Sequence, residues 1–158
     1  MRVRIAKNGD EAAIRTLLQG VHASFGEALA PRDGLERLLE EALAGDGQLE
    51  FLVAHEDAGD TEGLIGLISV TLGRTTQGAS TFAWIDDLFV APAARRQGVG
   101  LALLQAAVER GRERGAVEVR LSADMGDAAL IRLHRRAGFV SRGQVLMLHD
   151  LSAMKSEP

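Results

Sequence analysis

The chain of 158 residues contains no cysteine and no tyrosine, and it has one tryptophan and three prolines. The absence of cysteine excludes disulfide bonds, thiolate metal ligands and a cysteine nucleophile. No apolar run approaches the roughly 18 residues that a membrane-spanning helix needs, and the first residues lack the apolar stretch of a signal peptide. We therefore expect a soluble cytoplasmic protein without a membrane partner.

Charge and length narrow the class of protein further. The net charge of −4 argues against a nucleic-acid partner, which usually requires a basic excess on one face. His22, His55 and His149 show no spacing typical of metal ligands, so we expect no metal. Domains mostly have about 100 to 150 residues, which favours one domain over residues 1–152 and a frayed tail over residues 153–158.

Hydrophobic periodicity predicts an α/β fold, with a mixed sheet of about seven strands flanked by about four helices. The predicted helices follow Asp10, begin at Pro31, and cover residues 101–115 and 128–137. The predicted strands are residues 3–6, 49–56, 63–72, 81–90, 116–123, 138–143 and 144–151. The second and third strands predict an antiparallel hairpin. The last two predict a terminal hairpin, whose edge a second copy of the chain could cover in a homodimer.

The segment "APAARRQGVGLALL" at residues 91–104 lies where a predicted strand leads into a predicted helix. A helix N-terminus leaves backbone N–H groups without partners and carries a partial positive charge, which stabilises phosphate groups. Gly98 and Gly100 permit a ligand to approach the backbone, and Arg95 and Arg96 add positive charge. The segment therefore predicts a pyrophosphate site.

Two common nucleotide-binding motifs do not fit this segment. A P-loop requires lysine followed by serine or threonine after its last glycine, but Leu101 and Ala102 stand there. A dinucleotide fingerprint requires a third glycine where this chain has Leu103, and it begins directly at the end of the strand. A protein that binds ATP or NAD through the segment is therefore the weakest alternative.

The segment resembles motif A of the GNAT acyltransferase superfamily, in which a strand leads to arginine or glutamine, two variable residues, glycine, one residue, and glycine or alanine. Residues 95–100 match that pattern without a gap. The context is similar too, because an "IDDLFV" strand precedes the motif, and a helix, a strand and a helix ending in "AGF" follow it. The resemblance extends from Ile85 to Phe139.

The resemblance implies that acetyl-CoA, or a related acyl-CoA, is the cosubstrate. It implies a bulge that splays the sheet between the fourth and fifth strands, so that the pantetheine arm pairs with exposed backbone there. The pyrophosphate then binds amides at the start of motif A. The residues assigned to the donor in this way are Leu88, Phe89, Val90, Arg95, Arg96, Gln97, Gly98, Val99, Gly100, Leu101 and Asp127.

Direct transfer to an amine makes three chemical demands. An amine with a pKa of about 10.4 must lose a proton, and Asp86 or Asp87 is the candidate base. Adjacent strand residues point to opposite faces, so we expect only one of them to face the acceptor, and we favour Asp86. A backbone N–H near Leu88 or Phe89 is expected to stabilise the oxyanion. His134 stands where the family often has a tyrosine acid, although a thiolate whose thiol has a pKa of about 8.5 can leave unaided.

Each of these residues also has a structural interpretation. Asp127 is placed to cap the last helix, which does not exclude contact with the pantetheine. His134 shares a helical stripe with apolar residues, so packing is as consistent with the pattern as catalysis. One aspartate could pair with Arg120, because an unpaired charge is costly to bury. Trp84 lines either the core or the acceptor pocket.

The resemblance implies an N-acetyltransferase that acts on a primary amine of a small molecule in a ternary complex. The alternatives are a peptide or protein N-acetyltransferase and a non-catalytic acyl-CoA sensor, which the absence of tyrosine favours. We expect residues 21–33 to wall the acceptor site. Residues 123–127, "ADMGD", are faintly similar to a loop of aminoglycoside 3-N-acetyltransferases. The carboxylates of Asp86, Asp87 and Asp124 suit a polyamine or an aminosugar.

Overall fold

Strands and helices alternate along the chain, which the computed structural model describes over residues 1–25, 32–45, 47–56 and 63–147. The elements are β1 (Arg2–Ile5), α1 (Glu11–Phe25), α2 (Arg32–Ala44), β2 (Leu49–His55), β3 (Leu64–Thr75), β4 (Ser80–Val90), α3 (Val99–Glu113), β5 (Ala116–Leu121) and α4 (Ala128–Arg136). Short 3-10 turns at Gln77–Ala79 and Pro92–Ala94 precede β4 and α3. Within these residues no helix combines the length and the apolar character needed to cross a bilayer.

The strands of the described residues form one mixed sheet in the order β1-β2-β3-β4-β5. The first four pair antiparallel, and β5 lies parallel to β4. The predicted hairpin over residues 49–72 is confirmed as β2 and β3. The prediction of about seven strands is wrong for the described part, where five strands are found and residues 139–147 form none. Their side chains Val140, Val145 and Met147 are exposed. An alternating pattern supplies β propensity, but a strand also needs a partner, and residues 148–151 lie outside the described ranges.

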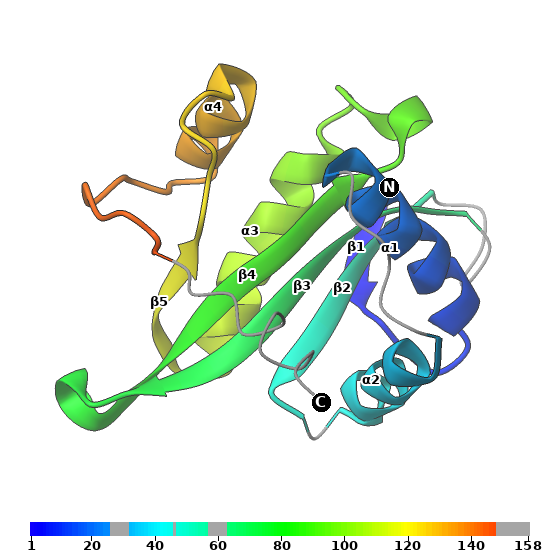
Figure 1. Ribbon diagram of the computed structural model, residues 1–158, viewed down its shortest axis with the longest axis horizontal. Helices are drawn as coiled ribbons and strands as arrows, with labels where there is room; N and C mark the ends of the chain where they lie inside the picture. The colour runs from blue at the N-terminus through cyan, green and yellow to red at the C-terminus, as the bar shows by residue number, and fades with distance from the viewer. Residues whose placement is uncertain (26–31, 46, 57–62, 148–158) are drawn as a thin grey trace, which may run out of the picture.

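The two faces of the sheet carry separate apolar clusters, each covered by helices (Figure 1). On one face, Ile68 and Val70 of β3 pack with α3. On the other face, Leu67 of the same strand packs with α1 and α2. Because successive strand residues point to opposite faces, β3 contributes to both clusters. These faces are called here the α3 face and the α1/α2 face.

β4 extends beyond its partner β5 at the C-terminal end. The two strands pair from Thr81 to Ile85, which lies opposite Leu121. Among the described residues, the last part of β4, residues 86–90, pairs only with β3. After Leu121 the chain leaves the sheet and runs to α4 (Figure 1). The expected separation of the fourth and fifth strands is therefore present along this part of β4.

A buried ion cluster ties α3 to the sheet. The Glu50 side chain of β2 is only 5% exposed and contacts Arg110 Nε at 2.5 Å and an Arg114 guanidinium nitrogen at 2.8 Å. The hydrogen bond with Glu50 raises the pKa of Arg110 and so keeps it charged. Because a buried carboxylate is stable only with such partners, the cluster fixes the direction of α3 and hence the position of its N-terminus.

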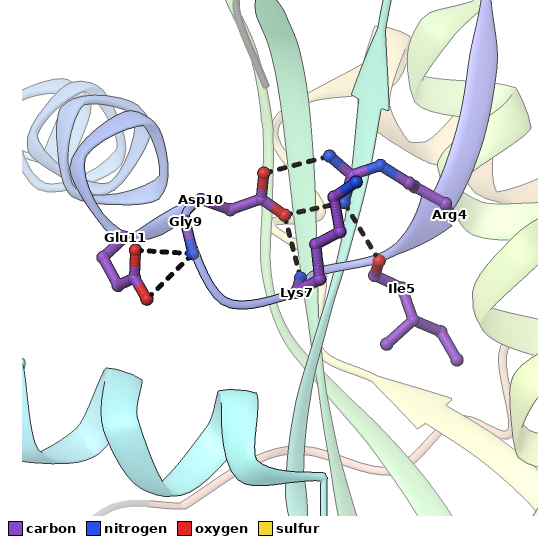
Figure 2. A network of polar contacts seen from close by, with 6 residues as sticks. All are labelled: Arg4, Ile5, Lys7, Gly9, Asp10 and Glu11. Carbon is purple, nitrogen blue, oxygen red and sulfur yellow. Dashed lines mark hydrogen bonds and ion pairs between the residues drawn. The ribbon is translucent and has the colours of Figure 1, made fainter. Parts of the chain in front are cut away.

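A second polar network, around Asp10, fixes the turn from β1 to α1 (Figure 2). The buried Asp10 carboxylate accepts hydrogen bonds from two Arg4 guanidinium nitrogens at 2.6 and 2.9 Å and from the Lys7 backbone N–H at 2.8 Å. Burial alone would raise the pKa of Asp10. The hydrogen bonds and positive charges of Arg4 and Lys7 outweigh it, so the pKa of Asp10 lies below its ordinary value of 3.8.

Replacing Asp10 by alanine removes the acceptor of these hydrogen bonds and should lower the free energy of unfolding by roughly 3 kcal/mol in urea titrations. A lowered pKa means that Asp10 stabilises the fold fully above its unfolded pKa, about 3.9, and ceases to do so as the pH falls through the folded value. The difference between wild type and Asp10→Ala should therefore shrink below about pH 4.

The matched control is Glu41→Ala, which removes an exposed ion pair with Arg37. Its free energy of unfolding should change by less than about 1 kcal/mol at any pH. A difference between wild type and Asp10→Ala that stays constant from neutral pH into the acid range would contradict this account of Asp10.

Candidate active site

A β-bulge interrupts the pairing of β3 with β4. Asp86 and Asp87 of β4 lie together opposite Ser69 of β3. The register pairs that flank them are Ile68 with Leu88 and Val70 with Ile85. Ser69, only 1% exposed, closes the bulge, because its Oγ accepts the Asp87 N–H at 2.8 Å and donates to Asp87 Oδ2 at 2.8 Å. One extra residue in a strand bends it and re-aims its side chains.

Both carboxylates lie on the α1/α2 face. Thr71 Oγ1 donates to Asp86 Oδ2 at 2.7 Å, while Ser69 Oγ donates to Asp87. Ser69 and Thr71 are two residues apart on β3 and share the face of Leu67, which packs with α1 and α2. The expectation that the two aspartates point to opposite faces is therefore wrong, because the bulge breaks the alternation on which it rested.

The partners of the two aspartates among the described residues are hydroxyl groups, not cations. Asp86 is exposed and Asp87 is half-buried. Arg120, the alternative partner, instead binds Glu118 through Nε at 2.6 Å and places its guanidinium carbon 4.2 Å from the Phe82 ring centre. Both carboxylates are therefore held in place without a bound charge that would neutralise them.

The backbone of β4 presents alternate amides to the open edge beside the bulge. The N–H groups of Asp87 and Ala91 both point toward β3, where they donate to Ser69 and Ile65. Because direction alternates along an antiparallel strand, the Phe89 amide also points toward β3. The amides of Leu88 and Val90 then point away from β3, to the side that β5 leaves open.

The side chain of Phe89 belongs to the core and not to the open edge. A Cβ added at Gly20 of α1 would lie 2.4 Å from the Phe89 ring, so the ring packs directly on that helix. The carbonyl of Val90 accepts a hydrogen bond from Arg95 Nε at 3.0 Å. Of the three strand residues assigned to the donor, the geometry thus favours the N–H groups of Leu88 and Val90.

The N-terminus of α3 follows directly and has no side-chain cap. Gly98 is the N-cap residue, with φ of 85°, and no side chain hydrogen bonds to the first turn. Arg96, with φ of 61°, is also left-handed, and its side chain is exposed. The amides that begin the helix therefore have no intrahelical partner and carry the partial positive charge expected of a helix start. This arrangement fits the predicted phosphate group.

Different structural constraints require glycine at the two glycine positions of the motif. A Cβ at Gly98 would meet no atom within 4 Å, so the constraint there is the left-handed backbone. A Cβ at Gly100 would lie 3.3 Å from Leu133 Cδ2, so Gly100 lets α4 pack against α3. The expectation that both glycines open space for a ligand therefore fits Gly98 better than Gly100.

The structure confirms that Asp127 caps α4, and it buries the side chain of His134 within that helix's contact with the core. Asp127 Oδ1 accepts hydrogen bonds from the N–H groups of Ala129 and Leu130, both at 2.9 Å, and so caps the helix. His134 is 7% exposed and lies edge-on to Phe139. Burial lowers the pKa of His134 below 6.5, and the charge of Asp127 offsets only part of this effect. A neutral imidazole is a poor proton donor, which does not favour His134 as the acid.

Sequence reasoning missed Ser69 and Thr71, which hold both aspartates. Their signal was two hydroxyl residues at strand spacing in an otherwise apolar run of β3. Much of the predicted acceptor wall, residues 26–31 of the range 21–33, lies outside the described residues. Trp84 is half-buried and lies opposite Thr71 in the register of β3 and β4. Within the described ranges, no three acidic or histidine side chains are grouped closely enough to hold a metal ion.

A family model and a curated relative that are similar to this chain indicate the same family, and a solved structure shares its fold. The model of the acetyltransferase (GNAT) family matches residues 14–139. Phosphinothricin N-acetyltransferase of Alcaligenes faecalis is 33% identical over 147 residues, covering 89% of this chain and 71% of that protein. The structure of AAC(6')-Iy with the bisubstrate analogue CoA-S-monomethyl-acetylneamine has a similar fold, with a TM-score of 0.77 at 20% identity over 94% of this chain and 97% of that one.

A similarity to aminoglycoside acetyltransferases is also present. Aminoglycoside N(6')-acetyltransferase type 1 of Klebsiella aerogenes is 40% identical over 63 residues. The match covers 40% of this chain and 41% of that protein, so the chain spans less than half the length of this relative. The name of this relative specifies the 6' nitrogen of the aminoglycoside. The loop at residues 123–127, in contrast, is faintly similar to aminoglycoside 3-N-acetyltransferases.

The backbone at Gly98 predicts opposite stability effects for two glycine substitutions. Gly98→Ala forces an alanine into the left-handed region and should lower the free energy of unfolding by about 1 kcal/mol. Gly34→Ala, in the exposed part of α2 with no atom within 4 Å of the added Cβ, should raise it by up to about 1 kcal/mol. Urea titration measures both, and a Gly98→Ala protein as stable as wild type would contradict the left-handed cap.

Proposed function

Because the chain belongs to the GNAT acetyltransferase family, we propose that it transfers an acetyl group from acetyl-CoA directly to a primary amine of a small molecule in a ternary complex. One observation carries the proposal. The bulge in β4 places two carboxylates on one face and turns the Leu88 amide to the open edge, next to the uncapped start of α3. The groups that we propose as base, oxyanion donor and phosphate site therefore all lie within residues 86–101.

The donor is held at the start of α3 and along the open edge of β4. The amides from Gln97 to Leu101 suit the pyrophosphate because they begin a helix without a side-chain cap. Arg96 adds positive charge from an exposed position, while Arg95 is partly engaged with the Val90 carbonyl. The N–H groups of Leu88 and Val90 are available to the pantetheine arm. The thioester of acetyl-CoA supplies the activated acyl group.

Asp86 is the proposed base. An amine with a pKa of about 10.4 arrives protonated, and it must lose a proton before its nitrogen can attack the thioester carbonyl. The carboxylate of Asp86 is exposed, so it can pass that proton to solvent, and Thr71 fixes its orientation. Asp87 is half-buried and bound to Ser69, which suits a structural role in the bulge.

The Leu88 N–H is the proposed oxyanion donor. It is the first amide after the bulge that points to the open edge, and a fixed backbone donor needs no reorganisation as charge develops on the carbonyl oxygen. Departure of the thiolate needs no acid from the chain, since the thiol has a pKa of about 8.5. The burial and lowered pKa of His134 support this unassisted departure.

The acceptor is proposed to be a cationic small molecule. Two carboxylates on one face attract and orient a protonated amine before the base acts. The names of the relatives support a small-molecule amine as the acceptor, and the aminoglycoside relative agrees with a cationic one. Two carboxylates held by hydroxyl groups, with no cation bound to them among the described residues, remain able to interact with such a substrate.

The donor proposal predicts that acetyl-CoA binds in calorimetric titration while ATP and NAD bind much more weakly. Release of the CoA thiol should then require an amine from a panel of phosphinothricin, neamine, spermidine and a lysine peptide. Binding with release by a small amine supports the proposed reaction. Release only with the lysine peptide would show that the acceptor is a peptide or protein and not a small molecule. Absence of acetyl-CoA binding would overturn the donor site.

The base proposal predicts that Asp86→Asn lowers kcat by roughly 10² to 10⁴ at neutral pH and leaves the affinity for acetyl-CoA unchanged. Glu109→Gln is the matched control, because Glu109 is an exposed carboxylate in the second half of α3 that pairs with Arg112 and lies outside the proposed site. Steady-state kinetics with the best amine of the panel should show a near wild-type rate for the control. A full-rate Asp86→Asn protein would exclude Asp86 as the base.

A further inference from the structure

We propose that Thr71 is a positioning residue for the base Asp86, whereas Ser69 serves Asp87 and the shape of the bulge. The inference rests on the proposed function and assigns different roles to two adjacent, chemically identical carboxylates. It follows from the different hydrogen bonds that neighbouring hydroxyls of β3 make to them.

The bond from Thr71 reaches only the side chain of Asp86. Thr71 Oγ1 lies 2.7 Å from Asp86 Oδ2, and among the described residues no hydrogen bond reaches the other carboxylate oxygen. Threonine is β-branched and stiff at χ1, so a threonine in a strand presents its hydroxyl in a fixed direction. One oxygen of Asp86 is thereby held, and the other is left to accept a proton from the amine or an intervening water.

The bonds from Ser69 have a different character. Its hydroxyl accepts from the backbone and donates to the side chain of the same residue, Asp87, and it is almost fully buried. These bonds set the path of the strand through the bulge. They also determine where the next amide, that of Leu88, points. Ser69 is therefore expected to act on the geometry of the oxyanion site without touching Asp86.

Loss of the Thr71 hydroxyl should leave the Asp86 carboxylate without a fixed orientation. The hydroxyl holds one carboxylate oxygen, and without that bond the other oxygen is no longer held toward the amine. A general base must lie within hydrogen-bond reach of the proton that it takes, so loss of orientation should lower kcat without weakening the binding of acetyl-CoA.

The other charged groups on this face do not change between the variants compared. They include Asp87 on β4, Glu118 with its partners Arg120 and Arg142, and the ion pairs Arg4–Asp10 and Arg15–Glu36 on the side that α1 and α2 cover. The buried apolar residues of α1 and α2 on this side are Ile14, Leu17, Leu18, Val21, Leu35, Leu39 and Ala42. Thr71→Val keeps the shape of the side chain and removes only the hydroxyl, while Thr71→Ser keeps the hydroxyl and restores the bond.

Two measurements on the same four proteins, namely wild type, Thr71→Val, Thr71→Ser and Ser69→Ala, test the inference. The first is the carbon-13 NMR chemical shift of the Asp86 carboxyl in ligand-free protein at neutral pH, which reports on its hydrogen bond and does not depend on activity. The second is steady-state kinetics at neutral pH, with kcat and KM determined for acetyl-CoA and for the best amine of the panel. Thermal unfolding of each variant confirms that it is folded.

The expected result is that Thr71→Val changes the chemical shift of the Asp86 carboxyl and lowers kcat roughly tenfold, with an unchanged KM for acetyl-CoA. Thr71→Ser should restore the wild-type behaviour. Ser69→Ala should lower kcat while leaving the chemical shift of the Asp86 carboxyl unchanged.

Three results would overturn the inference. The first is a wild-type Asp86 carboxyl signal in Thr71→Val, and the second is an equal change of that signal in Ser69→Ala. The third is a changed signal with a wild-type kcat in Thr71→Val, because Thr71 would then position a carboxylate that is not the base. If the wild type bound acetyl-CoA but transferred no acetyl group, the proposed reaction would fail instead, and the NMR signal would still report on the contact itself.

Discussion

The buried hydroxyl of Ser69 is the contact on which the proposed chemistry depends. By accepting from the backbone of Asp87 and donating to its carboxylate, it stabilises a strand that carries one residue too many for regular pairing. That extra residue brings Asp86 and Asp87 to one face. It also sets the phase of the following amides, so that Leu88 points to the edge that β5 leaves open.

The rest of the fold holds this short stretch of β4 in place. α1 packs on Phe89 immediately after the bulge. The buried Glu50 binds Arg110 and Arg114, so α3 is anchored to the sheet near its C-terminus and its N-terminus is directed past the end of β4. Burial of apolar residues on both faces makes the sheet rigid. A rigid frame is what a preorganised oxyanion donor and phosphate site require.

Much of this architecture was predictable from local signals in the sequence. Apolar periodicity identified the helices and the first five strands, and the glycine and arginine spacing located the start of α3, where we propose that phosphate binds. The placement of Asp86 and Asp87 was not predictable from alternation, because a bulge is a property of the pairing between β3 and β4. The lowered pKa of His134 depends on burial that its helical stripe indicated only in part.

The most direct test of the account is nitrogen-15 NMR of the backbone amides during titration with acetyl-CoA. The signals of Leu88 and of the start of α3, from Gly98 to Leu101, are expected to shift most on binding. The Phe89 amide, which faces β3, should shift less than its neighbour Leu88. Saturable binding that leaves Leu88 and the start of α3 unperturbed would contradict the assignment of the bulge edge and the helix N-terminus to the acyl donor.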